Sequence, residues 1–156
     1  MLHCMAMAEL AHHYYDVPVW SFAGCSDSNT ADMQAGVDSA MWILWTALCG
    51  SNLVHDVGYI DNGKACSTAQ LVLGNESIGM AKRFIRGIEV NRDTLARELI
   101  EKVGPAGHFL TEVHTFENFK KELWIPDLMT RSAYAKWHEE GAKDMAQRVQ
   151  EKIQDI

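Results

Sequence analysis

Pro18-Val-Trp-Ser-Phe-Ala-Gly-Cys-Ser-Asp-Ser28 is the stretch that decides the fold, because a short apolar run leads directly into small and polar residues. The segment Asn52-Leu-Val-His-Asp-Val-Gly-Tyr59 repeats this pattern, and a long segment with helical spacing lies between the two. Strand, polar tip, helix and strand in this order favour a parallel α/β arrangement, in which reactive groups gather where strands end. We therefore expect parallel strands at Val19–Ala23 and Leu53–Val57, with a site at their carboxyl ends.

Most of the remaining chain has the spacing of amphipathic helices, with a polar loop expected over residues 58–68. Gly74-Asn75 is expected to separate two of these helices, and His108-Phe-Leu110 is a weak candidate for a third strand. The expected helices cover residues 3–14, a segment capped by Asn29 or Thr30 and ended by Gly50, and residues 68–73, 76–88, 93–103, 115–123 and a last helix from Ser132 onward.

Composition narrows the class of protein. Apolar residues make up 47% of the 156, enough for a substantial core, and the net charge is −7 with no basic cluster. Nucleic acid and anionic membranes are poor partners for such a surface. The longest apolar run is too short to span a bilayer, and no signal peptide is indicated. Four scattered cysteines fit a reducing cytoplasm, and their spacing indicates no metal site.

The number of strands bears on how complete the domain is. Two parallel strands, or three with the weak one, are few for an eight-stranded α/β barrel, which needs upwards of ~200 residues. The chain also opens on Met1 within a pattern that is already helical. We therefore expect residues 1–156 to form a single partial domain, the C-terminal portion of a TIM-type (α/β)8 barrel.

A series of blocks resembles the C-terminal third of the trimethylamine methyltransferase family from about residue 8 onward. The blocks follow one another in order: Glu9-Leu-Ala-His-His-Tyr-Tyr-Asp-Val-Pro-Val-Trp20, Ala23-Gly-Cys-Ser-Asp-Ser28, Gln34-Ala-Gly36, Asn52–Tyr59, Ile78-Gly-Met80, Arg86-Gly-Ile-Glu-Val90, Val103-Gly-Pro-Ala-Gly-His-Phe-Leu110 and Glu122-Leu-Trp124. Many separate blocks in register are more specific than any single short motif.

The resemblance implies an (α/β)8 barrel that moves a methyl group from a methylated amine to the cobalt of a separate corrinoid protein. No cofactor would then be bound by this chain directly, since the partner protein supplies the corrinoid. Family members that use trimethylamine carry pyrrolysine, encoded by an amber codon, before the region matched here. Met1 is accordingly expected to be a start that follows such a codon. Other members lack pyrrolysine, and some of them act on glycine betaine.

Removing a methyl group from an amine calls for negative charge near a cationic nitrogen and an aromatic enclosure for the methyl groups. The candidate catalytic residues at the strand tips are Asp56, His55 and Asp27, with His55 as a proton shuttle. In a regular strand His55 and Asp56 point to opposite faces, so only one of them would face the barrel interior. The candidate substrate-binding residues are Tyr59, Trp20, Cys25 and Gly58.

Several structural alternatives stand beside these roles. Asp27 could instead cap the following helix, and Trp20 could be a packing residue. The chain as a whole could be a non-catalytic fragment or a docking module for the corrinoid protein. It could also be part of an unrelated α/β-barrel enzyme. The unpaired sheet edges of a partial barrel predict a homo-oligomer or a poorly soluble chain.

Overall fold

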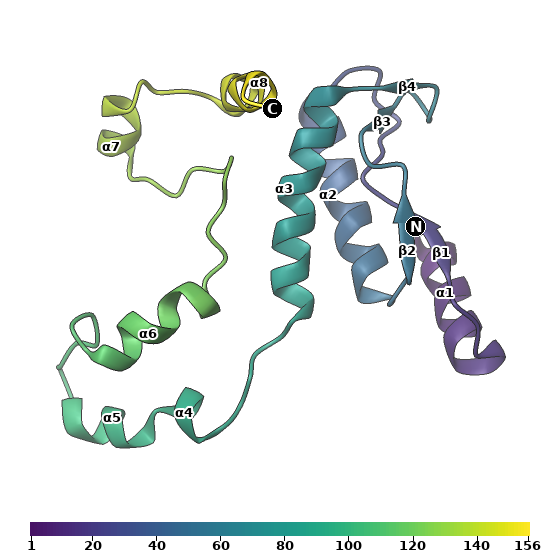
Figure 1. Cartoon of the computed structure of the whole chain (residues 1–156). Coiled ribbons are helices and arrows are strands. Elements are labelled where there is room, and N and C mark those ends of the chain that lie inside the picture. Colours follow the sequence, from purple (N-terminus) through teal and green to yellow (C-terminus); the bar gives the residue numbers. More distant parts are fainter. The chain divides into compact units, whose positions relative to one another are not determined.

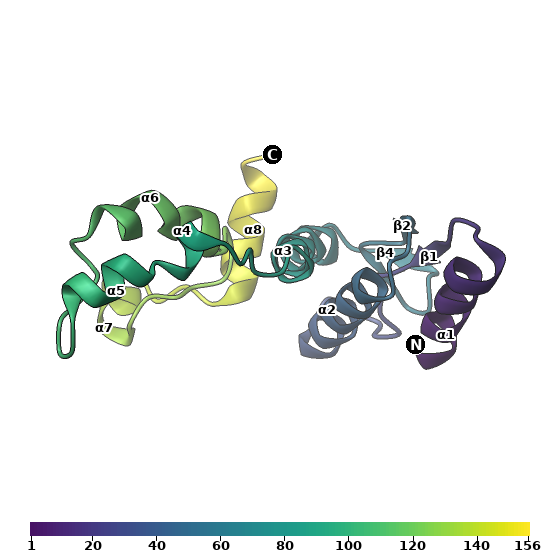
Figure 2. The same cartoon turned by 90° about the horizontal axis from the view of Figure 1, so that it is seen from below.

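The computed structural model describes residues 1–156, which divide into two compact units, one formed by Met1–Ile85 with Pro126–Ile156 and the other by Arg86–Ile125. Figures 1 and 2 show the elements in two views at right angles. The first unit contains α1 (Leu2–Leu10), a π-helical turn (Ala11–Tyr15), β1 (Trp20–Phe22), α2 (Met33–Leu48), β2 (Leu53–His55), β3 (Tyr59–Ile60), β4 (Ala65–Cys66), α3 (Thr68–Ile85), α7 (Tyr134–Glu139) and α8 (Met145–Gln154). The second unit contains α4 (Arg92–Leu95), α5 (Arg97–Val103) and α6 (Val113–Glu122).

The two expected strands form and are parallel. β1 and β2 pair in the register Trp20↔Leu53 and Phe22↔His55, and α2 makes the crossover between them. Both strands are shorter than predicted, since regular pairing stops one or two residues before each polar tip. The sheet has only these two strands, so the structure shows an α/β core with one parallel pair and does not by itself define a barrel.

Helix α2 begins at a different cap from the expected one. The carboxylate of Asp32 accepts a hydrogen bond from the Ala35 N–H at 3.0 Å, so Asp32 is the N-cap, and the prediction of Asn29 or Thr30 was wrong. That bond, which stabilises the charged form, lowers the pKa of Asp32. Gly50 follows the helix with φ +75°, as expected for a glycine at a helix C-terminus.

Residues 58–68 are more ordered than a polar loop. β3 and β4 form a short antiparallel pair around the turn Asp61-Asn62-Gly63, in which all three residues have positive φ. Asx and glycine residues tolerate that conformation, so the turn was readable from the sequence, but two-residue strands carry too little periodicity to predict.

Helix α3 runs unbroken from Thr68 to Ile85, and the predicted break at Gly74-Asn75 was wrong. Gly74 is buried inside the helix, where an added Cβ would lie 2.6 Å from Val57 Cγ1. The glycine therefore permits close packing against the segment after β2 instead of ending the helix. α3 also packs along α2, and Gln70 Nε2 donates a hydrogen bond to the Ala35 carbonyl oxygen at 3.0 Å.

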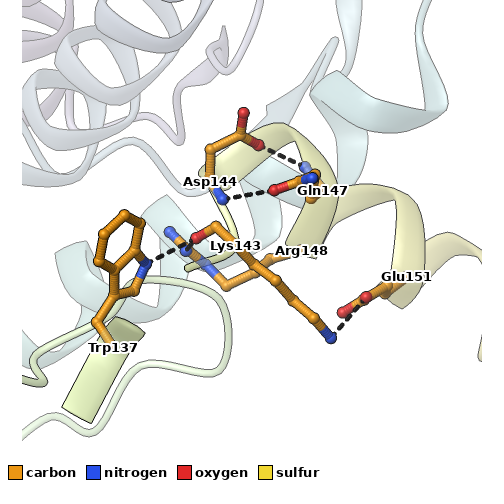
Figure 3. Close-up of polar contacts among 6 residues, drawn as sticks. All are labelled: Trp137, Lys143, Asp144, Gln147, Arg148 and Glu151. Carbon is orange, nitrogen blue, oxygen red and sulfur yellow. Dashed lines mark hydrogen bonds and ion pairs between the residues drawn. The ribbon is translucent and has the colours of Figure 1, made fainter. Parts of the chain in front are cut away.

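The single helix expected from Ser132 onward is divided into α7 and α8 by a turn that contains Gly141 at φ +96°. Figure 3 shows how that turn is fixed: Trp137 Nε1 donates to the Lys143 carbonyl oxygen at 2.9 Å, and Arg148 donates to the same oxygen. Asp144 and Gln147 form a reciprocal capping box at the start of α8, with both hydrogen bonds at 2.8 Å.

The second unit, Arg86–Ile125, contains no buried residue. The helix predicted at 93–103 is interrupted at Ala96, which has φ +47°. α6 begins at Val113, earlier than the predicted Thr115, and its N-cap Glu112 makes no side-chain capping bond. His108–Leu110 forms no strand, so the weak third strand is absent.

The core of the first unit forms where β1 meets the helices. Ala23, Ile43 and Ala81 are buried together, and partly buried side chains of α2 and α3 pack around them. Val149 of α8 is also buried, and α8 packs against α3. Across the whole chain, none of the helices combines the length and apolar character needed to cross a bilayer.

Candidate functional site

The carboxyl ends of β1 and β2 continue side by side beyond the regular strands. Ala23 N donates to His55 O at 3.0 Å, Gly58 N donates to Gly24 O at 3.1 Å, and Ser26 N donates to Tyr59 O at 3.0 Å. These bonds confirm the expectation that the segments around residues 24 and 56 lie next to each other. The predicted site residues on the two segments are therefore neighbours in space.

The side chains of His55 and Asp56 contact each other, contrary to the expectation that they point to opposite faces. Asp56 has φ +71°, a left-handed conformation that ends the strand and turns its carboxylate back toward the preceding residue. His55 Nδ1 lies 2.7 Å from Asp56 Oδ1. An ionised carboxylate can only accept, so Nδ1 carries the proton, and Nε2 is left without a partner in the chain.

Trp20 lies against the same imidazole. The rings of Trp20 and His55 meet edge to face with centroids 5.5 Å apart. Trp20 is 70% exposed, so it is not a core packing residue, and that alternative is set aside. One ring nitrogen of His55 is thus held by a carboxylate, while an exposed aromatic ring flanks the imidazole.

Cys25 lies in the segment that follows β1, and its thiol is affected by the charges of several carboxylates. Burial raises the pKa of the Cys25 thiol, and the negative charges of Asp56, Asp27 and Asp38 raise it further, with a backbone hydrogen bond offsetting only part of the effect. The thiol is therefore protonated at neutral pH, and the field around it is negative. Such an environment disfavours a thiolate and favours a bound cation.

Asp27 is exposed and makes no capping bond, since Asp32 caps α2. This observation removes the capping alternative for Asp27, although no contact of its carboxylate defines a catalytic role.

Asp38 is the residue that sequence reasoning missed. It lies on α2 and accepts a hydrogen bond from Ser26 Oγ at 2.7 Å, and its charge acts on Cys25. An aspartate in the middle of a helix rich in apolar residues was the available signal. Its helical position gave no indication that it would face the strand tips.

Gly58 and Tyr59 connect the tip of β2 to the β3–β4 pair. Gly58 is buried with φ +95°; its N–H donates to Gly24 O, and its carbonyl oxygen accepts from Ser67 N at 2.9 Å. Its backbone polar groups are thus both used within the chain. Tyr59 is half-buried and follows directly, and its carbonyl oxygen accepts the hydrogen bond from Ser26 N.

Nowhere in the chain do three or more His, Cys, Asp or Glu side chains gather as a metal ion would require. A separate open pocket of about 760 Å³ lies within Arg86–Ile125, but none of the predicted site residues lines it. Its wall carries side chains of both charges, among them the exposed ion pair between Arg92 and Glu98. The candidate site is the pair of strand tips, because the predicted residues lie together there.

The two parallel strands, with aspartates in the segments that follow their carboxyl ends, define an α/β protein. The sequence profile described as trimethylamine methyltransferase (MTTB) matches residues 1–156. The chain therefore belongs to the trimethylamine methyltransferase family.

Individual relatives agree with this membership. The chain is 41% identical over 136 residues to the glycine betaine methyltransferase of Desulfitobacterium hafniense strain Y51, covering 86% of this chain and 28% of the relative. It is 36% identical over 150 residues to the trimethylamine methyltransferase MttB of D. hafniense strain DCB-2, covering 96% and 30%. It is 35% identical over 153 residues to MttB1 of Methanosarcina mazei, covering 97% and 30%. The chain thus spans about 30% of the length of such relatives.

Proposed function

We propose that the chain serves in a methyltransferase that takes a methyl group from a methylated amine and passes it to the cobalt of a separate corrinoid protein. In this proposal it contributes the later strands of an (α/β)8 barrel, and its strand tips line part of the substrate site. Family membership supports the reaction class. The four cysteines are all free, which agrees with a reducing cytoplasm as the proposed location.

The single observation that carries the proposal is the negative field at the strand tips. The carboxylates of Asp56, Asp27 and Asp38 all act on the half-buried Cys25 and raise the pKa of its thiol. A cation gains more from such charges there than in bulk water. The exposed ring of Trp20, which lies against His55, and the ring of Tyr59, which follows Gly58, are the proposed faces, each attracting a quaternary or protonated ammonium group by ~0.5–2 kcal/mol.

The proposed chemistry assigns a task to each side chain. The corrinoid supplies the cobalt nucleophile that accepts the methyl group, while the electron pair of the broken C–N bond stays on nitrogen. The carboxylates hold the positive charge of the amine before transfer, and the aromatic rings enclose its methyl groups. His55 exchanges a proton through Nε2 with a tertiary amine, whereas a quaternary amine needs no proton because it departs neutral.

Asp56 then orients His55 and fixes its tautomer, because the Nδ1 proton is bound to the carboxylate. Replacing Asp56 by Asn would keep the shape while removing the charge. Replacing His55 by Ala would remove the proton shuttle, with an expected loss on the order of 10²-fold for a tertiary amine.

The test follows methylation of the corrinoid cobalt by its absorbance, with trimethylamine and glycine betaine as separate substrates. The chain is assayed alone and together with the remaining portion of a family enzyme. Asp56→Asn should slow methyl transfer from either substrate and His55→Ala should slow it from trimethylamine, while Asp155→Asn, at an exposed site near the C-terminus, should leave the rates unchanged. Unaltered rates in both site variants would refute the assigned roles.

Glycine betaine is a second candidate substrate, supported by the 41% identity to a glycine betaine methyltransferase. Its quaternary nitrogen suits the same acidic and aromatic site, but its methyl transfer should not depend on His55 as a proton shuttle. A His55→Ala variant that loses transfer from trimethylamine and retains it from betaine would identify this distinction.

A docking module without catalysis is a third reading. It predicts that the chain binds the corrinoid protein while substitutions at Asp56 and His55 change neither binding nor transfer. Retained binding with lost transfer in the same variants would instead support the catalytic proposal.

A further inference from the structure

Val57, the residue after Asp56, lies between two glycines that come from different parts of the chain. A Cβ added to Gly24, at the tip of β1, would lie 3.1 Å from Val57 Cα and from both of its methyl groups. A Cβ added to Gly74, inside α3, would lie 2.6 Å from Val57 Cγ1. The 2.6 Å contact at Gly74 is closer than real Cβ contacts come, and the 3.1 Å contacts at Gly24 are tighter than most, so Val57 is packed closely between two glycines.

Gly74 stands where a helix would otherwise favour another residue. Glycine is the least favourable non-proline residue in a helix interior, and Gly74 is in the middle of α3 with helical residues on both sides. Its φ is not positive, so no backbone conformation demands glycine there. The remaining physical reason is the close contact with Val57.

Val57 is linked covalently to the catalytic pair. Asp56 has φ +71° and holds His55 Nδ1 at 2.7 Å, while Gly58 on the other side has φ +95° and is bonded to Gly24. Asp56 and Gly58 thus have positive φ on either side of Val57, and this leaves the backbone of Val57 little room for adjustment. A displacement of Val57 is therefore transmitted to the carboxylate of Asp56.

We propose that Gly74 is a positioning residue for the His55–Asp56 pair, acting through Val57. Its part in methyl transfer rests on the proposed function, but its effect on the geometry of the pair does not. Because Gly74 has no side chain, Val57 can lie close to α3. The distance between Val57 and α3 then determines where the carboxylate of Asp56 contacts the imidazole of His55.

Gly74→Ala tests this proposal against a matched control, Gly36→Ala. Gly36 lies inside α2, where an added Cβ would be 3.5 Å from Leu73 Cδ2, an ordinary contact. Both changes give the same gain in helix propensity, but only the first meets a clash. Val57→Ala, which removes the clashing methyl group, is combined with Gly74→Ala as the rescue variant.

The primary measurement is the ¹⁵N chemical shift of the His55 ring nitrogens in the full chain. Gly74→Ala should move the Nδ1 signal as its bond to Asp56 is disturbed, Gly36→Ala should not, and Gly74→Ala/Val57→Ala should return it toward the original value. Should Gly74→Ala fail to fold, a double variant that folds with the original signal still supports the contact. An Nδ1 signal that is unchanged in a folded Gly74→Ala chain overturns the proposal, and so does a double variant that remains as disturbed as the single one.

The methyl-transfer assay is the second readout. Displacement of a catalytic group by about 1 Å costs on the order of 10²-fold in rate, so Gly74→Ala should lower kcat by roughly 10- to 100-fold with little change in KM. A moved Nδ1 signal without any change in transfer would uphold the positioning role and refute the proposed function of His55. The experiment therefore distinguishes a failure of the positioning role of Gly74 from a failure of the proposed function.

Discussion

Single residues at the strand tips hold conformations that the rest of the fold must support. Asp56 is a non-glycine residue at φ +71°, where a backbone costs on the order of 1–3 kcal/mol unless its surroundings compensate. In this conformation its carboxylate contacts His55 Nδ1 at 2.7 Å. Strain of this kind collects at functional sites, so Asp56 is the residue whose replacement is most informative.

Cys25 gives a prediction at this scale. Its pKa is raised by burial and by the charges of Asp56, Asp27 and Asp38, so little reactive thiolate is present at neutral pH. Iodoacetamide at pH 7 should modify the exposed Cys66 well before Cys25, and modification of Cys25 should accelerate as the pH rises. Peptide mass spectrometry measures both rates.

A control variant separates the effect of nearby charge on the reactivity of Cys25 from the effect of its burial. Asp56→Asn removes one negative charge and leaves the burial of Cys25 nearly unchanged, so the pKa of the thiol should fall and alkylation at a given pH should become faster. Equal alkylation of Cys25 in the two proteins across the pH range would contradict the electrostatic explanation.

Among the elements, α3 organises the first unit through buried polar side chains. Glu76 is 5% exposed, and its carboxylate accepts three backbone hydrogen bonds: from Leu128 N at 2.9 Å, from Met129 N at 3.0 Å and from Asp127 N at 3.3 Å. Arg148 of α8 donates to the Leu128 carbonyl oxygen at 2.6 Å. The segment after Ile125 is thus held on α3 by bonds to its backbone.

Glu76→Ala should therefore destabilise the chain strongly. It leaves three backbone N–H groups without their acceptor, that of the buried Leu128 among them, and the expected loss in the free energy of unfolding is on the order of 3 kcal/mol. Urea denaturation measures it. Glu139→Ala, an exposed glutamate of α7, should change stability by less than ~0.5 kcal/mol. Equal losses for the two variants would show that the Glu76 bonds contribute nothing specific.

For the chain as a whole, the amount of uncovered apolar surface is the dominant feature. The parallel sheet has two strands, and the outer edge of each is unpaired. Leu53 on β2 is 55% exposed, and in the unit Arg86–Ile125 Phe116 is 76% exposed. Open strand edges and exposed apolar side chains favour association with other chains.

We therefore expect the isolated chain to self-associate as its concentration rises. Light scattering coupled to size-exclusion chromatography should report a mass above 17.5 kDa at high concentration. Leu53→Lys, which charges the open edge, should reduce association, whereas Asn62→Lys, the same charge on an exposed turn, should not. A stable monomer at all concentrations would count against a partial barrel.

The sequence by itself determined the two parallel strands, the helix between them and the side-by-side polar tips. These features follow from local apolar spacing and from the tendency of parallel strands to end at one edge. It also placed His55, Asp56 and Cys25 in one region, because all three belong to those tips, whereas Trp20 begins β1 and reaches His55 only through its ring.

Only the tertiary structure decided the features that depend on contacts between distant segments. Gly74 reads as a helix break in isolation and becomes a packing site because Val57 approaches it. Asp38 joins the site because α2 folds back over Ser26. His55 meets Asp56 because a left-handed backbone overrides strand alternation. Local propensity describes a residue's own backbone, while these outcomes depend on which atoms the fold brings against it.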